Sequence, residues 1–471
     1  MWKHADSICW NDVRIEINRE SEFPPTKYFW VNNQNFTYPV MFTSGLELSL
    51  WLNDGIIQLM NIHQLKEQTV GAAVSGGLDS CTITKWLVDN GVNVVCLTAD
   101  LGQPDERNVD EIKDRMLACG AQEAIIVDAK DALAEEGLKL IQCQAKYEGG
   151  YWNTTGIARH VTVKALLPEM EKRGISILTH GATGRGNDQV RFQLATNMLN
   201  PHFSVYAPWR DAEFLKHFGG RKEMIDFCQE HGLPITATHE KPYSTDANLL
   251  GLTHEAGRLE SLKTPAGFIT PGMGVHPKDA PDDVEHFSVT YARGIPVEIN
   301  GSPCTPLMSL VEANRIGGRN GVGIGIHTVE NRFVGIKSRG VYESPGMELL
   351  GRCYEFLLQL ILDRRARRHY DGVADTIAEQ IYQGYWFDAG TQSMLGSIET
   401  LTRLASGTIT VALYKGNVAF HAATGVPHSL YSEETASMED IGDFDHADSE
   451  GFLAVLGVGA RASAIAGQIE E

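Results

Sequence analysis

The chain has 471 residues, which is enough for two or three domains with buried cores. Its 60 Asp and Glu residues outnumber 40 Lys and Arg residues, and the formal net charge is −20. This balance argues against a surface that neutralises nucleic-acid phosphates or an acidic membrane, so we expect neither as a partner.

The first 64 residues form a segment of their own, rich in aromatic side chains and Asn, in which Leu52, Ile56, Leu59 and Met60 recur at helical spacing. We predict an N-terminal extension over residues 1–64, and the sequence assigns it no role. The first residues lack the basic end, apolar stretch and cleavage site of a secretory signal. The eight cysteines form no C-x-x-C pair, and no run of about 18 apolar residues occurs. We therefore expect a soluble, cytoplasmic protein with reduced thiols.

Strand-like and helical patterns alternate over residues 65–234. The predicted strands are 70–74, 92–100, 123–129 and 175–181, and the predicted helices are 79–90, 108–118 and 156–173. Such alternation predicts a nucleotide-binding α/β domain whose parallel sheet carries helices on both faces. Its ligands are expected at the carboxyl ends of the strands.

From residue 235 the pattern is less regular, because Gly and Pro separate short segments, and we predict a second, mixed α+β domain over 235–431. Its regular elements are a strand-like stretch at 286–301, helices at 347–363 and 373–384, and a strand at 407–416. The first of these helices carries a packing stripe of Leu350, Tyr354, Leu357, Leu358 and Ile361. The tail, 432–471, is acidic and then rich in small residues, which favours an arm that contacts a partner chain.

The strand at 70–74 leads into the loop Ser75-Gly76-Gly77-Leu78-Asp79-Ser80. Two glycines let the backbone approach a ligand, while two hydroxyls and the free N–H groups of the next helix suit a polyphosphate. The loop lacks the lysine of a Walker sequence, which would hold a γ-phosphate for transfer. We therefore favour a loop that grips leaving pyrophosphate, with a plain strand-to-helix turn as the alternative.

A second Gly-rich segment, HGATGRGNDQVR at 180–191, follows another predicted strand. It combines small residues, amide and carboxylate groups and two arginines, a composition suited to charged ligands, although a solvated loop has the same composition. Two such loops at neighbouring strand ends favour a binding site. His180 and His254 each lack a second ligand at fixed spacing, so we read them as structural residues and predict no tightly bound protein metal.

Further segments extend the pattern: ADLGQ (99–103), APWRD (207–211), YSTDANLLGLTHEAG (243–257), GVG (321–323) and VENRFVGIKSRGVYESPG (329–346). With the two loops, and in this order and spacing, they make the chain resemble argininosuccinate synthase, of the N-type ATP pyrophosphatase superfamily, over residues 68–430. The resemblance implies an α/β fold with a Rossmann-like ATP-binding domain of the adenine nucleotide alpha hydrolase type. It also implies an α+β synthetase domain and a C-terminal oligomerisation arm in a homotetramer.

The resemblance also implies the site residues. The ATP-binding set is Ala73, Val74, Ser75, Gly76, Gly77, Leu78, Asp79, Ser80, Cys81, Ala99, Gly181, Thr183, Asp188 and Asp246. The aspartate-binding set is Thr183, Asn187 and Asp188. The citrulline-binding set is Tyr151, Asn187, Arg191, Ser244, Thr253, Glu255, Glu330 and Tyr342. The catalytic set is Asp79, Asp188 and Arg191, without a named general base.

The implied activity is that of an AMP-forming carbon–nitrogen ligase of arginine biosynthesis. The ureido oxygen of citrulline attacks the α-phosphate of ATP and expels magnesium pyrophosphate, and the amine of aspartate then displaces AMP. ATP with Mg²⁺, citrulline and aspartate are thus the expected small-molecule substrates. Catalysis is expected from positioning and from stabilisation of phosphate charge.

Several residues depart from the family pattern. Cys81 stands where a second hydroxyl often follows the loop, Asn320 where a histidine is usual, and Gly156 where some members have a side-chain contact. These departures and the extension motivate a second hypothesis, a paralogue in specialised metabolism with another ureido or amide acceptor. A third hypothesis, a non-catalytic or tRNA-modifying relative, is disfavoured by the acidic charge and the absence of paired thiols.

Overall fold

The computed structural model describes residues 60–106, 108–235, 243–436 and 445–469, and the backbone of four strands within residues 7–42. The chain forms two compact units, Met1–Met60 and Asn61–Glu471. The described strands of the first unit form an antiparallel sheet in sequence order: β1 (Ser7–Trp10), β2 (Val13–Ile17), β3 (Lys27–Asn33) and β4 (Phe36–Phe42). The helical spacing predicted over Leu52, Ile56 and Leu59 falls outside the described residues.

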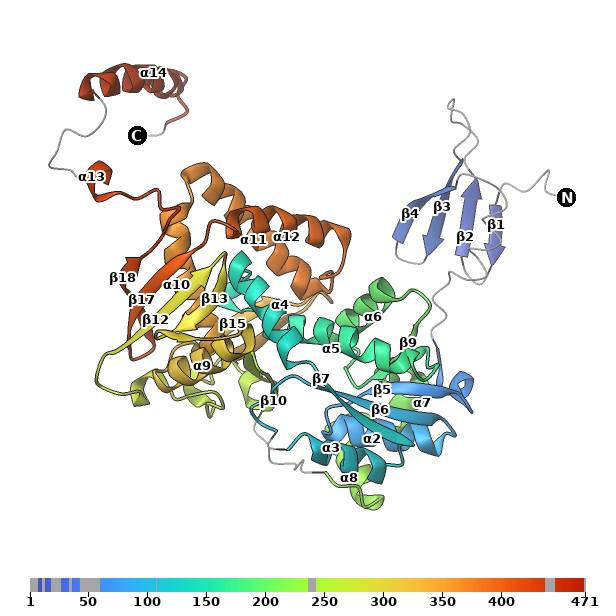
Figure 1. Ribbon diagram of the computed structural model, residues 1–471. Helices are drawn as coiled ribbons and strands as arrows, with labels where there is room; N and C mark the ends of the chain where they lie inside the picture. The colour runs from blue at the N-terminus through green and yellow to red at the C-terminus, as the bar shows by residue number, and fades with distance from the viewer. Residues whose placement is uncertain are drawn as a thin grey trace. The chain divides into compact units, whose positions relative to one another are not determined.

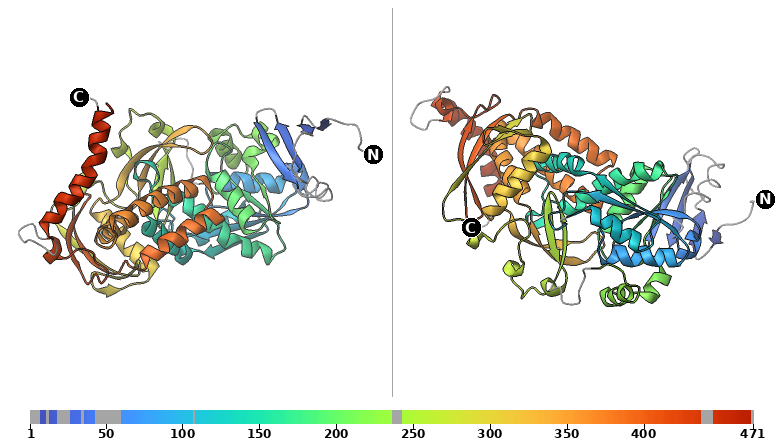
Figure 2. Two further views of the ribbon diagram at one scale, coloured as in Figure 1. Left: turned by 90° about the horizontal axis from the view of Figure 1, so that it is seen from above. Right: turned by 60° about the horizontal axis from the view of Figure 1, so that its bottom comes forward.

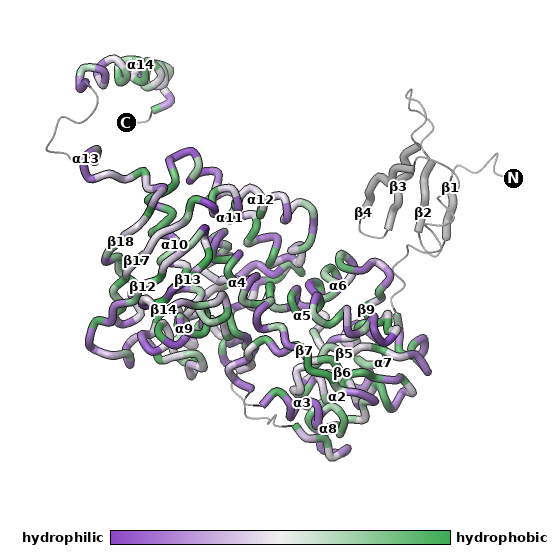
Figure 3. The backbone as a smooth tube through the Cα atoms, viewed as in Figure 1, coloured by the Kyte–Doolittle hydropathy of each residue, from purple (hydrophilic) through white to green (hydrophobic). Residues whose placement is uncertain are grey.

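The second unit begins with a parallel sheet of order β7-β6-β5-β8-β9. Its strands are β5 (Thr69–Ala73), β6 (Asn93–Asp100), β7 (Glu123–Asp128), β8 (Ile177–His180) and β9 (Ser204–Tyr206). The interior of β6 is buried on both faces, as expected for a strand covered by helices on each side, and Figure 3 shows it as hydrophobic. This confirms the predicted Rossmann-like α/β fold.

Helices cover both faces of this sheet (Figure 1). On one face α2 contacts both α3 and α8, and on the other α5 contacts both α4 and α6. The right-hand view in Figure 2 shows the strands between the blue helix α2 and the cyan to green helices. The bounds are α2 (Leu78–Asp89), α3 (Asp110–Ala118), α4 (Lys130–Cys143), α5 (Thr154–Glu171), α6 (Asp188–Leu199), α7 (Ala212–His217) and α8 (Arg221–Glu230).

The remainder of the unit contains two antiparallel sheets, of orders β10-β11-β16-β15 and β14-β13-β12-β17-β18. The strands of the first are β10 (Ser244–Asn248), β11 (Gly251–Glu255), β15 (Ile324–Asn331) and β16 (Lys337–Glu343). Those of the second are β12 (Glu285–Ala292), β13 (Ile295–Ile299), β14 (Ser302–Pro303), β17 (Gly407–Tyr414) and β18 (Asn417–Thr424). The helices are α9 (Pro306–Arg319), α10 (Pro345–Ile361), α11 (Arg364–Gln383), α12 (Ala389–Thr402), α13 (Glu433–Ala436) and α14 (His446–Ile465).

One hydrophobic core joins the parallel sheet to these later elements. It runs from Leu97 on β6 through Leu140 on α4 and Ile157 on α5 to Leu357 on α10 and Ile377 on α11. The stripe predicted on α10 is buried in this core, as expected. Because α4 and α5 pack on both parts, the two ligand-bearing regions are held in a fixed geometry. Among the described residues, we find no helix with the length and apolarity needed to cross a membrane.

Candidate active site

The loop between β5 and α2 is built to present backbone N–H groups. Gly77, which precedes α2, has no side chain to cap the first turn of the helix. Gly76 has a φ of 75°, in the left-handed region that favours glycine, and a Cβ there would lie 3.0 Å from Ile112. Arg115 Nη1 donates to the Gly76 carbonyl oxygen at 3.0 Å and holds the loop in this shape. The uncapped N–H groups and the helix dipole therefore favour an anion.

Ser75 and Ser80 of this loop line a cavity, but Cys81, which follows the loop, does not. Ser75 N donates to Ser80 Oγ at 3.0 Å, and both residues line a cavity. Cys81 is fully buried, with its Sγ 4.0 Å from the Gly76 carbonyl oxygen, and is absent from the lining. The substitution at Cys81 therefore changes packing behind the loop rather than the surface offered to a ligand.

The loop borders a cavity of about 250 Å³, which we call the nucleotide cavity because the family resemblance implies ATP beside this loop. Strand ends supply its walls, because β5 and β8 pair directly with Ala73 opposite His180 and their following loops face each other. The lining residues are Ala73, Val74, Ser75, Asp79, Ser80, Leu97, Ala99, Leu101, Gln103, Arg159, Thr162, His180, Gly181, Ala182, Asp188, Phe192 and Asp246. Sheet order changes direction at β5, and such a switch point is where α/β sheets bind ligands.

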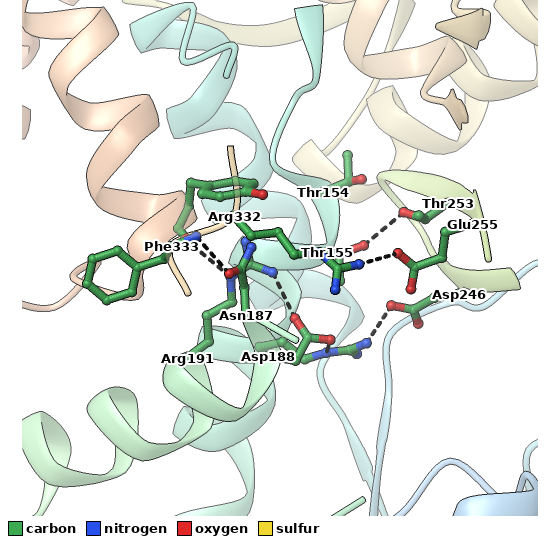
Figure 4. Close-up of polar contacts among 12 residues, drawn as sticks. Thr154, Thr155, Asn187, Asp188, Arg191, Asp246, Thr253, Glu255, Arg332 and Phe333 are labelled. Atoms are coloured by element: carbon green, nitrogen blue, oxygen red, sulfur yellow. Dashed lines mark hydrogen bonds and ion pairs between the residues drawn. The ribbon is translucent and has the colours of Figure 1, made fainter. Parts of the chain in front are cut away.

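A second cavity of about 250 Å³ is the more polar of the two. We call it the amino-acid cavity because the family resemblance implies that its residues bind citrulline and aspartate. Its lining residues are Asp79, Tyr151, Thr155, Gly181, Ala182, Thr183, Gly186, Asn187, Asp188, Arg191, Asp246, Thr253, Glu255, Glu330, Arg332, Tyr342 and Tyr382. Figure 4 shows that Asn187, Asp188 and Arg191 at the start of α6 face Asp246, Thr253 and Glu255 from β10 and β11.

The two cavities meet. Both are lined by Asp79, Gly181, Ala182, Asp188 and Asp246. These five residues, which we call the junction, come from the first loop, the second loop, the start of α6 and β10. A group bound in one cavity can therefore react with a group bound in the other.

Two ion pairs fix the charge state of Asp188. Arg159 Nε donates to Asp188 Oδ2 at 2.9 Å, and its Nη2 donates to Asp246 Oδ2. Arg191 Nη1 donates to Asp188 Oδ1 at 2.8 Å. Burial alone would raise the pKa of Asp188, but the two guanidinium groups outweigh it and lower that pKa to about 2. Asp188 is therefore a permanent carboxylate and not a proton acceptor at neutral pH.

The other junction carboxylates have the opposite perturbation. Burial raises the pKa of Asp246, and Arg159 only partly opposes it. Burial also raises the pKa of Asp79, although Trp209 Nε1 donates to Asp79 Oδ1 at 3.2 Å and opposes the shift. In both carboxylates the cost of desolvating the charged form therefore exceeds the stabilisation that neighbouring groups provide.

Aromatic rings form one wall of the amino-acid cavity. The Tyr151 and Tyr342 rings stack with centroids 4.1 Å apart. Tyr342 Oη donates to Glu330 Oε1 at 2.7 Å, and Thr155 N donates to Tyr151 Oη at 3.0 Å. Burial raises the pKa of Tyr151 to about 12, so this phenol stays neutral. The wall therefore positions the Glu330 carboxylate without adding charge.

The loop between β15 and β16 closes over the second Gly-rich loop. Phe333 N donates to Asn187 Oδ1 at 3.0 Å, and Arg332 Nη1 donates to the Arg185 carbonyl oxygen at 3.2 Å. Arg332 Nη2 lies 3.5 Å from Glu255 Oε2 (Figure 4). Burial raises the pKa of Glu255 to about 6, because the single Arg332 does not offset it and other carboxylates lie near.

Histidines do not create a metal centre in the described part of the chain. Ala182 N donates to His180 Nδ1 at 3.2 Å, and burial lowers the pKa of His180 to about 3. His254 Nε2 lies 2.5 Å from Glu343 Oε1 in a fully buried pair. The residues that the structure describes contain no group of three or more His, Cys, Asp or Glu arranged to hold a metal ion.

Most residues expected from the sequence line one of the two cavities. Those outside both linings are Gly76, Gly77, Leu78, Cys81 and Ser244. Sequence reasoning missed Arg159 and Tyr382, which lie in α5 and α11 without a local motif. Arg332 was also missed, although it stands in the segment VENR that the family pattern includes.

Comparison with known proteins identifies the family. A model described as "Arginosuccinate synthase N-terminal HUP domain" matches residues 69–234, and one described as "Arginosuccinate synthase C-terminal domain" matches residues 243–463. The chain is 42% identical over 391 residues to the argininosuccinate synthase of Rhodopirellula baltica, covering 83% of this chain and 96% of that protein. It is 39% identical over 395 residues to that of Thermotoga maritima, covering 83% and 95%.

A third relative, the argininosuccinate synthase of Desulfitobacterium hafniense, is 36% identical over 395 residues, with 83% of this chain and 96% of that protein covered. The solved structure of a U34-tRNA thiolase from Methanococcus maripaludis aligns with 42% of this chain and 66% of that chain, at 16% sequence identity and a TM-score of 0.23. This likeness is too weak to bear on function. Two domain matches that span the second unit, and relatives matched over nearly their whole length, lead to one conclusion: the chain belongs to the argininosuccinate synthase family.

Proposed function

We propose that this chain condenses citrulline with aspartate in an ATP-dependent reaction that releases AMP and pyrophosphate, and that the junction is where the bonds change. The family and its relatives indicate argininosuccinate synthase and do not favour a paralogue with another acceptor. The observation that carries the proposal is the set of five residues shared by the two cavities. An α-phosphate in the first cavity and an attacking oxygen in the second can meet only there.

The nucleotide cavity supports binding of ATP with its pyrophosphate on the first loop. The first turn of α2 has no side-chain cap, and Ser75 and Ser80 line the cavity. The loop from Ser75 to Ser80 contains no lysine to activate a γ-phosphate. Leu97, Ala99 and Leu101 offer an apolar wall for the adenine. The loop thus favours pyrophosphate as the leaving group over transfer of the terminal phosphoryl.

Asp79 fits a role beside Mg²⁺ that enters with ATP. Mg²⁺ is commonly held by one or two carboxylates together with substrate phosphates, and Asp79 is a single carboxylate on the first turn of α2. The raised pKa of Asp79 indicates that the surrounding residues do not fully compensate its charged form. When bound, Mg²⁺ would supply that compensation and neutralise the departing pyrophosphate.

The amino-acid cavity offers matching charges for two zwitterions. Arg191 is buried, and its Nη2 has no hydrogen-bond partner among the described residues, so it can donate to a substrate carboxylate. Glu255 and Glu330 supply negative charge for an α-ammonium group of citrulline. We assign Thr183 and Asn187, on the second loop, to the incoming aspartate.

Geometry and charge, rather than covalent catalysis, drive the proposed reaction. In the first step the ureido oxygen attacks the α-phosphate in line, forms a P–O bond and breaks the bond to pyrophosphate. In the second step the aspartate amine, after losing a proton to solvent, forms a C–N bond with the activated carbon, and the C–O bond to AMP breaks. Because Asp188 is locked as a carboxylate by two arginines, it orients groups and does not take the amine proton.

We also propose a division of labour and an assembly. Residues 65–234 would carry the ATP, and residues 235–431 would add Glu255, Glu330 and others to the amino-acid cavity. The family models match residues 69–234 and 243–463, which supports a division near residue 235. The arm, 432–471, would join subunits of a cytoplasmic homotetramer, because α14 exposes Phe452, Leu456 and Val458.

The decisive experiment incubates the purified chain with ATP, Mg²⁺, citrulline and aspartate and follows pyrophosphate and argininosuccinate. We expect pyrophosphate release that requires citrulline and product formation that requires both amino acids. Pyrophosphate release that ignores citrulline but responds to another ureido compound would contradict the proposal.

A further inference from the structure

Arg159 bridges two carboxylates of the junction that come from distant parts of the chain. It lies on α5, where its Nε donates to Asp188 on α6 at 2.9 Å and its Nη2 donates to Asp246 on β10. Sequence separations of 29 and 87 residues divide it from these partners. Arg159 therefore joins the two regions that contribute the nucleotide cavity and the amino-acid cavity.

Negative charges are concentrated at the junction, and the guanidinium of Arg159 offsets part of them. Asp79, Asp188 and Asp246 are the charged residues shared by both cavities, and all three are carboxylates. A polyphosphate brought to this place meets like charges at short range, which is costly in a partly dehydrated site. Of these three carboxylates, Arg191 pairs with Asp188 alone. The negative charge of Asp246 is therefore offset by Arg159.

One nitrogen of the Arg159 guanidinium, Nη1, takes part in neither ion pair. The guanidinium plane carries five N–H donors, and the two ion pairs use Nε and Nη2. Nη1 has no hydrogen-bond partner among the described residues, and Arg159 lines the nucleotide cavity. Both carboxylates hold the planar group in place, so the free nitrogen has a fixed position.

We propose that Arg159 is a catalytic residue whose Nη1 donates to the α-phosphate of ATP and stabilises the charge that develops there as citrulline attacks. The inference rests on the proposed ligase function. The Asp188 and Asp246 carboxylates hold the guanidinium before substrate arrives, so little reorganisation is needed when the phosphorus becomes five-coordinate. A purely structural bridge between two carboxylates is the competing explanation.

A double variant separates the two explanations. If Arg159 only bridges the two carboxylates, then Arg159→Ala does less harm once Asp246→Asn has removed one of them, because only the pair with Asp188 is then lost and Arg191 still donates to Asp188. If Nη1 contacts the phosphate, the donor is missing in either background. The variants are therefore Arg159→Ala, Asp246→Asn and the two together, assayed by citrulline-dependent pyrophosphate release.

We expect Arg159→Ala to lower kcat by about 100-fold, the usual cost of one transition-state donor, with a similar fall in kcat/KM. The double variant should remain about 100-fold below Asp246→Asn. A double variant within a few-fold of Asp246→Asn would overturn the inference. An Arg159→Ala effect confined to KM for ATP would overturn it too.

A matched control is available just after the end of the same helix. Arg173 also pairs with two carboxylates, Glu123 and Glu169, each at 2.9 Å, but lines neither cavity. Arg173→Ala should leave kcat within about twofold, because such surface pairs contribute little.

Thermal unfolding without ligands checks that each variant is folded. If Arg159→Ala is not, Arg159→Lys takes its place, since lysine keeps the charge but not the fork. We expect Arg159→Lys to be folded and at least about tenfold slower, and a wild-type kcat would overturn the inference.

The unsubstituted chain tests the proposed function separately. If the unsubstituted chain releases pyrophosphate only with another acceptor, the proposed function fails. The kcat of Arg159→Ala relative to that of the unsubstituted chain, measured with that acceptor, still decides the role of Arg159. Pyrophosphate release that needs no acceptor would contradict both proposals.

Discussion

The pH dependence of citrulline binding should report on Glu255. We propose that this carboxylate holds the α-ammonium group of citrulline, and burial raises its pKa to about 6. A raised carboxylate pKa means that the binding-competent anion is present above pH 6 and is lost as pH falls. Citrulline should therefore bind more weakly below pH 6, with KM rising in the acid range.

The expected size follows from the fraction ionised. With a pKa near 6, about nine-tenths of Glu255 is ionised at pH 7 and about one-tenth at pH 5, so KM for citrulline should rise about tenfold. A carboxylate with an ordinary pKa near 4.5 would lose only about a quarter of its charge over the same interval. The two cases differ by several-fold, which steady-state kinetics resolves.

The assay measures KM for citrulline from pH 5 to 8 at saturating ATP, Mg²⁺ and aspartate. Glu255→Gln should have a high KM that is nearly independent of pH, because it removes the titrating group. Asp246, whose pKa is also raised, is the nearby alternative, and Asp246→Asn should keep the slope. A flat profile in the unsubstituted chain, or the same slope in Glu255→Gln, would refute the assignment.

Three further outcomes are expected. Arg191→Lys should lower kcat/KM for citrulline by about 10- to 100-fold, which corresponds to the loss of one or two charge-assisted hydrogen bonds. The control Arg315→Lys, at an exposed ion pair on a helix, should have little effect on kcat/KM. Equal effects of the two variants would argue against a substrate contact by Arg191. Gly76→Ala should raise KM for ATP, because φ at this residue is 75° and Ile112 lies 3.0 Å from a Cβ built there. The control Gly372→Ala, in open space on α11, should stabilise the protein against thermal unfolding by up to about 1 kcal/mol. An unchanged KM for ATP in Gly76→Ala would show that the loop does not bind phosphate in this shape. The His180 ring should show no NMR titration from pH 5 to 8, because burial lowers its pKa to about 3, and a midpoint near 6.5 would contradict the buried environment.

Features with a local signal were predictable from the sequence. The apolar run that became β6 and the two glycines before α2 are recognisable because strand burial and a left-handed turn each constrain neighbouring residues. By contrast, α11 begins at Arg364, after the capping residue Asp363, with a run of residues rich in arginine that the predicted helix at 373–384 does not include. Propensity placed that helix nine residues too late, since charged residues in an exposed first turn show no apolar period.

The sequence by itself determined the class of chemistry: the loop at Ser75 to Ser80 lacks a lysine, and its family motifs occur in order. Only the tertiary structure decided the charge states and the partners at the junction. Arg159 lies inside a helix that is buried on nearly all sides, so no periodicity singles it out. Its partnership with Asp188 and Asp246 exists because α5 packs between α6 and β10, and a carboxylate's role as ion-pair partner or proton acceptor depends on that neighbourhood.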